Sequence, residues 1–156
     1  MMWAALVTLG GVALGWFLNE ITRARTARAE IARRRSDFQR ETLLELQDVL
    51  NEVTHLTVTL TEERIDKARI TSEGWASAFA SEEVQEAHRA AYRRGYILLS
   101  RVQDDRLREL GSEVLYRASA AVGAADPTAA GVERSATADR ALVALTAIGD
   151  HLRGLL

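Results

Sequence analysis

The residues best suited to bind a metal in this 156-residue chain are Glu52 and His55, which form a Glu-x-x-His pattern in a helical stretch. Helical bundles that hold two iron ions use two such patterns and two further inward-facing glutamates. The sequence has one copy, because neither His88 nor His151 follows a glutamate three positions earlier. We therefore interpret His55 as a polar residue on the flank of a bundle, and we expect no metal and no cofactor.

Other patterns associated with enzymes are missing from the sequence. There is no cysteine, no glycine-rich phosphate loop, no G-x-S-x-G and no H-E-x-x-H. A dense group of charges is typical of a solvated helix face with pairs three and four residues apart. This charge cluster comprises Arg101, Asp104, Asp105, Arg106, Arg108 and Glu109. We expect no catalytic residues and no enzymatic activity.

The first 18 residues contain no charged side chain. As a helix they would be about 27 Å long, close to the hydrocarbon thickness of a bilayer. Trp3 and Trp16 lie toward the two ends, where indole rings favour the membrane interface. The pattern predicts a transmembrane helix over residues 1–18. A cleaved signal peptide and a buried helix of a soluble protein are the alternatives, but no basic residue precedes the apolar run and the run has no polar face.

Residues 19–40 form a basic segment, with seven arginines against three carboxylates. Arginine close to an apolar span favours the cytoplasmic side, so we expect the N-terminus outside and residues 41–156 in the cytoplasm, at the inner (cell) membrane. The same side chains could bind anionic lipid head groups. Six flank the predicted span most closely: Arg23, Arg25, Arg28, Arg33, Arg34 and Arg35.

Two glycines in the predicted span have the spacing that lets helix backbones approach closely. Gly11 and Gly15 form a G-x-x-x-G pair. We interpret them as candidates for helix association, and we expect the chain to associate with itself.

The remaining sequence predicts an all-helical fold. It has one proline and only 6% aromatic residues, and Leu43 begins an apolar stripe with steps of three and four residues through Leu60. Breaks rich in Gly, Ser and Asp separate helices at about 41–72, 82–122 and 127–155. In the second break, Gly123 suits a C-cap, Asp126 an N-cap and Pro127 the first position of the last helix. We expect a transmembrane helix continuous with a long stalk helix, followed by an antiparallel up-down three-helix bundle.

Trp75 and Phe79 lie in the first break, four residues apart. Exposed aromatic residues often anchor protein partners, whereas buried ones would close the end of the bundle core. Both interpretations remain open, and we treat the pair as candidate partner anchors.

The sequence plan resembles small single-pass membrane proteins of GC-rich actinobacterial genomes and their phages. The likeness lies in the opening Met-Met-Trp-Ala-Ala-Leu, the following Gly-Gly and the Thr-Arg-Ala-Arg-Thr-Ala-Arg of residues 22–28. It implies one N-terminal span followed by an Arg-rich stretch and a helical bundle. From the residues themselves we expect a lipid bilayer and an unknown cytoplasmic protein as partners. The acidic balance after residue 40 argues against nucleic-acid binding. We expect a membrane-tethered scaffold or adaptor; the alternative is a membrane-active, holin-like or accessory protein that oligomerises through its span.

Overall fold

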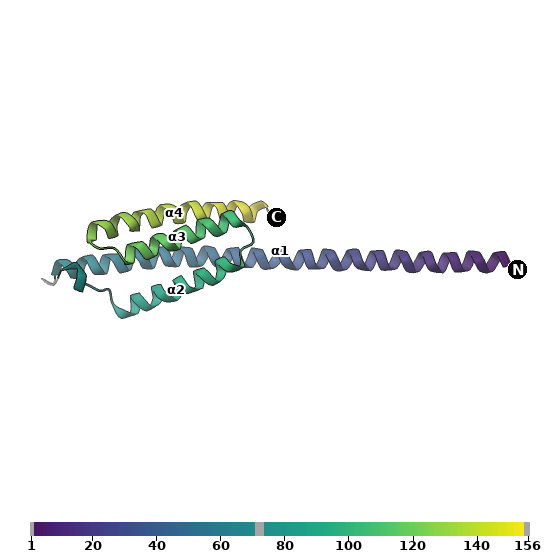
Figure 1. Ribbon diagram of the computed structural model, residues 1–156, viewed down its shortest axis with the longest axis horizontal. Helices are drawn as coiled ribbons and strands as arrows, with labels where there is room; N and C mark the ends of the chain where they lie inside the picture. The colour runs from purple at the N-terminus through teal and green to yellow at the C-terminus, as the bar shows by residue number, and fades with distance from the viewer. Residues whose placement is uncertain (1, 71–73, 155–156) are drawn as a thin grey trace. The chain divides into compact units, whose positions relative to one another are not determined.

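The computed structural model describes the backbone of residues 2–70 and 74–154, and the side chains of these residues except 2–18, Ile21 and Ala24. Within that part of the chain there are four α-helices, one short 3-10 helix and no strand, which confirms the prediction of an all-helical fold. The elements are α1 (Met2–Ile70), η1 (Trp75–Ser77), α2 (Glu82–Arg101), α3 (Asp105–Val122) and α4 (Pro127–Gly154). Figure 1 traces them in order.

The chain divides into two compact units, Met1–Phe38 and Gln39–Leu156. The predicted span over residues 1–18 belongs to the first unit, and its side chains lie outside the described part of the structure. Where the structure does describe the residues, it contains no helix with an apolar stretch long enough to cross a membrane.

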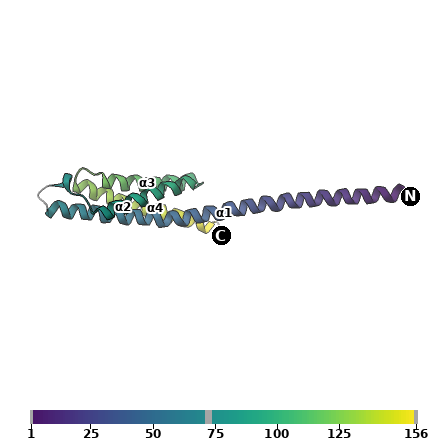
Figure 2. The same cartoon turned by 90° about the horizontal axis from the view of Figure 1, so that it is seen from below.

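The second unit is a helical bundle in which successive helices are antiparallel. Thr57 of α1 contacts His88 of α2, while Glu52 pairs with Arg94 further along, so residue numbers rise in opposite directions in the two helices. The same holds for α3 and α4, which lie side by side (Figures 1 and 2). Side-chain bonds also join α1 to α4, where the Gln47 amide donates to the carbonyl oxygen of Leu145.

The apolar stripe predicted on α1 forms the centre of this bundle. Its members are at most 2% exposed: Leu43, Leu46, Leu50, Val53, Thr57 and Leu60. Thr57 is tolerated there because its hydroxyl donates to the carbonyl oxygen of Val53, at 2.7 Å. Alanines supply much of the buried surface of the other helices: Ala91, Ala118, Ala121, Ala130, Ala141 and Ala144.

The prediction of one helix over residues 82–122, and hence of three bundle helices, is wrong. The helix ends at Arg101, and Val102 is extended, with ψ at 125°. Asp104 then caps α3, since its side chain accepts from the Leu107 N–H at 2.9 Å. Gln39 satisfies the backbone groups freed by the break: it accepts from Gln103 N–H and donates to the Arg101 carbonyl oxygen. Part of the predicted charge cluster is therefore a helix boundary.

The start of the last helix follows the sequence expectation. Asp126 caps α4 by accepting from the Ala129 N–H at 2.8 Å, and Pro127 occupies the first helical position. Gly123 is the C-cap residue of α3. The local sequence was sufficient to predict this helix start, because an N-cap residue and a proline affect the backbone only within a few residues.

Candidate functional site

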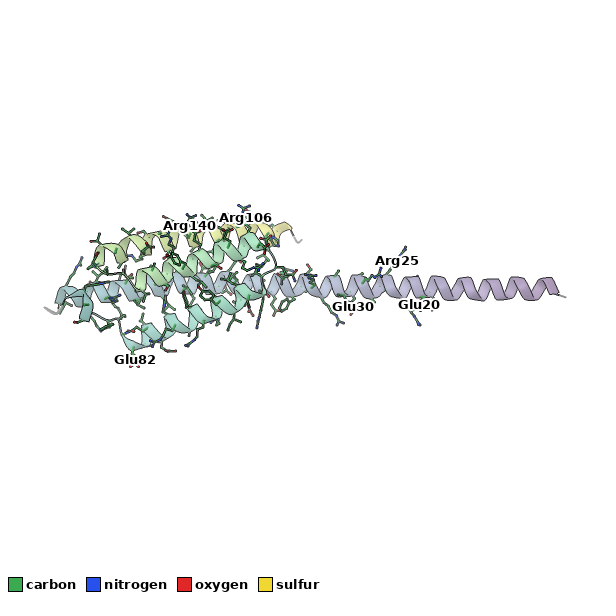
Figure 3. All side chains as sticks on the ribbon, in the orientation of Figure 1. Glu20, Arg25, Glu30, Glu82, Arg106 and Arg140 are labelled. Carbon is green, nitrogen blue, oxygen red and sulfur yellow. The ribbon has the colours of Figure 1, made fainter. Side chains whose placement is uncertain are left out.

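The six arginines that flank the predicted span project into solvent from α1. Figure 3 shows Arg25 extending away from α1, and it labels Glu30 on the same helix. Arg34 pairs with Glu30 and Arg33 with Asp37, each four residues along the helix. These positions present positive charge around the helix. Gly11 and Gly15 lie on α1, but their surroundings fall outside the described side chains.

The structure places the two candidate aromatic anchors in different environments. Trp75 is half-buried; its indole N–H donates to the carbonyl oxygen of Ala124 at 2.8 Å, and the Arg64 guanidinium lies 4.0 Å from its ring centroid. Phe79 is 59% exposed. Trp75 thus closes the end of the bundle, whereas Phe79 presents an aromatic surface to solvent.

Arg64 connects three segments at this end of the bundle. It donates to the carbonyl oxygens of Ala78, at 2.9 Å, and Val122, at 2.6 Å. The second bond places a cation at the C-terminus of α3, where the helix dipole favours one. Burial lowers the pKa of Arg64 from its usual value. Sequence analysis missed this residue, because its partners lie up to 58 positions away.

His88 is a second polar residue that sequence analysis did not place. It is 6% exposed, and its Nε2 lies 3.1 Å from the Thr57 hydroxyl oxygen. That hydroxyl already donates its only proton to Val53, so Nε2 of His88 is the donor and Nδ1 is left as an acceptor. Burial lowers the pKa of His88, which favours the neutral ring.

Aromatic rings continue from His88 along α2. The Tyr92 ring stacks on His88 with centroids 6.1 Å apart, and the Tyr96 ring meets Tyr92 edge-on at 5.1 Å. The two phenol oxygens are 3.4 Å apart, and this hydrogen bond raises the pKa of Tyr96. The four-residue spacing of the tyrosines is a signal that sequence analysis could have used.

The predicted Glu-x-x-His pattern does not gather ligands. Glu52 pairs with Arg94 at 3.3 Å, and His55 is exposed. Over the described residues there is no group of three or more His, Asp or Glu side chains placed to hold a metal ion. His151 lies beside Asp104, with Nδ1 and Oδ2 3.9 Å apart.

Two hollows open on the bundle between α2 and the end of α3. One, of about 360 Å³, is lined by residues of α2 and by Ser119 and Val122 of α3. The other, of about 260 Å³, includes Arg64, Phe79 and again Val122. The arrangement offers apolar and aromatic surface beside guanidinium groups, which suits a binding surface better than a set of reacting groups.

Comparison with known proteins found no match for this chain. A scan against protein-family models, a search of curated proteins and a search of solved structures each returned no match.

Proposed function

We propose that this chain is a non-enzymatic, membrane-tethered adaptor whose helical bundle presents a binding surface in the cytoplasm. The observation that carries the tether is the order of residues: 18 without charge, then 22 with seven arginines. The first stretch suits the hydrocarbon core and the second suits the inner leaflet. The exposed positions of the arginines support this assignment, because side chains at the bilayer surface must reach lipid head groups.

The bundle supports an adaptor because two polar side chains in its interior, those of His88 and Arg64, are engaged in holding the fold. His88 bonds to Thr57, and Arg64 bonds to two carbonyl oxygens. Exposed aromatic residues, by contrast, supply area for contact with a protein: Phe79, Tyr96 and Tyr116.

Membrane fractionation of the full chain tests the tether. We expect the wild type to stay in the membrane pellet through an alkaline carbonate wash and to need detergent for release. Leu9→Arg with Leu14→Arg should move the chain to the soluble fraction, because charge in the hydrocarbon core is costly. A matched control, Leu142→Arg with Val143→Arg, changes two exposed residues of α4 and should stay in the pellet. Recovery of the wild type in the soluble fraction without detergent would overturn the tether.

Orientation can be tested separately because the natural chain has no cysteine. Single variants Met2→Cys and Ser135→Cys are treated in intact cells with a maleimide that cannot cross the inner membrane. We expect Met2→Cys to be labelled at once, and Ser135→Cys only after that membrane is permeabilised. Labelling of Ser135→Cys in intact cells would show the opposite orientation.

The membrane-active alternative rests on the Gly11 and Gly15 spacing. Its distinguishing result is leakage of the inner membrane on expression, lost when both glycines are replaced by leucine. Expression without leakage favours the adaptor.

A further inference from the structure

The two hollows described above are neighbours on the bundle surface, because Val122 lines both of them. One hollow lies against Tyr92 and the other against Phe79. We call this surface the α2–α3 groove. It belongs to the compact unit Gln39–Leu156.

The groove exists because the two halves of α2 carry different side chains. Near its C-terminus α2 buries Leu98 and Leu99, but its earlier buried residues are His88, Ala91 and Gly95. α2 and α3 approach closely where Gly111 faces Leu99, since a Cβ on Gly111 would lie 2.5 Å from the Leu99 Cδ2. Toward its N-terminus α2 diverges from α3 (Figure 1), and it has no large aliphatic side chain there to fill the space.

The charge of the groove is one-sided. Arg64, Arg89 and Arg93 line it, and no carboxylate is among its described lining residues. Glu86, beside the groove, binds both Arg89 and Arg93, so one carboxylate serves two guanidinium groups. Arg64 bonds to carbonyl oxygens. A partner with carboxylates would therefore complement this surface.

We propose that the α2–α3 groove binds an acidic amphipathic helix of a second protein. Apolar side chains on one face of that helix would contact Phe79, Tyr92 and Val122, and flanking Asp or Glu would pair with Arg89 and Arg93. Two hollows side by side suit anchors repeated along a helix face. This inference rests on the proposed adaptor function and identifies the partner's chemistry.

A different protein fits better than a second copy of this chain. The apolar stripe of α1 from Leu43 to Leu60 is buried in the core, as are Val114, Leu115 and Ile148 of α3 and α4. Since this stripe and these residues are already covered within the described second unit, we expect the helix that enters the groove to come from another chain.

The test uses the full chain in nanodiscs and a display library of helical peptides. The library fixes leucine at positions i, i+3, i+7 and i+10 and randomises the others. We expect selected peptides to be enriched in Asp and Glu at the flanking positions. The tightest peptide should lose at least tenfold in affinity, by fluorescence anisotropy, when Arg89→Glu and Arg93→Glu are combined. The matched control, Arg40→Glu with Arg106→Glu, makes the same charge change at other exposed positions and should leave affinity unchanged.

A second variant blocks the groove by volume. Ser119→Trp places a large ring at an exposed position of α3 and should also weaken binding tenfold while the circular dichroism spectrum is kept. Selection of basic peptides would overturn the proposal. So would a peptide affinity that stays unchanged both in the Arg89→Glu, Arg93→Glu variant and in Ser119→Trp. So would self-association of the chain that Ser119→Trp abolishes, because a second copy would then occupy the groove. If fractionation finds the chain soluble, the same assay runs without lipid, so the groove and the tether fail independently.

Discussion

At the scale of single residues, the side chains of His88 and Arg64 connect helices of the bundle, although neither residue belongs to a sequence motif. His88 donates to Thr57 inside the core, and Arg64 connects α1 to the segment after η1 and to the end of α3. Their roles depend on partners more than ten positions away, which residue patterns do not reveal.

We predict that acid destabilises the protein through His88. Burial lowers the pKa of the folded imidazole below its unfolded value of about 6.5. The unfolded chain therefore binds the proton more readily, and stability present above that pH is lost as the pH falls through it. The melting temperature should fall between pH 7.5 and 5.5, and less so in His88→Gln, whose amide can still donate to Thr57. His55→Gln, at an exposed position, should melt like the wild type across this range. If the melting temperatures of His88→Gln and the wild type fell equally with pH, protonation of His88 would not be the cause of the loss.

The two aromatic residues of the first break should respond differently to the same change. Trp75→Leu removes the bond to Ala124 and the contact with Arg64, and it should lower the free energy of unfolding by about 2 kcal/mol. Phe79→Leu, at an exposed site, should change it by less than about 0.5 kcal/mol. Urea denaturation of both variants measures the difference. Similar losses for the two would contradict the role assigned to Trp75.

At the scale of the elements, the division into α2 and α3 is the main departure from the sequence expectation. Apolar residues such as Leu98, Val102 and Val114 keep helical spacing across the break, so periodicity alone predicts one helix. The break is stabilised by Gln39, which lies 62 and 64 positions from its partners. Asp104 is a residue type that caps helices, but in the sequence it is one of several neighbouring charged residues and does not stand out as a cap.

Close packing of α2 against α3 predicts different effects for two glycines. Gly111→Val should cost about 1–3 kcal/mol, because its side chain would overlap Leu99. Gly131→Ala has open space around it and should stabilise α4, by up to about 1 kcal/mol. Thermal unfolding of the two variants compares them. A neutral Gly111→Val would mean that the helices can separate at this point.

At the scale of the whole molecule, the chain consists of two compact units, and the boundary along the chain lies between Phe38 and Gln39. The core of the second unit is made from residues 43–148. We predict that a fragment of residues 39–156 folds alone, with one cooperative transition in urea followed both by circular dichroism and by Trp75 fluorescence. A fragment starting at residue 48 lacks Leu43 and Leu46 and should be markedly less stable. Non-coincident transitions for residues 39–156 would show that this unit needs the preceding helix.

The sequence by itself determined the helical class, the buried stripe of α1 and the start of α4 at Asp126 and Pro127. Each depends on residues within one or two helical turns, where periodicity and capping act. Only the tertiary structure decided the break at residues 102–104, the contacts of Arg64 with Trp75, and the α2–α3 groove. These features depend on which distant side chains meet, and that is set by packing of whole helices rather than by local spacing.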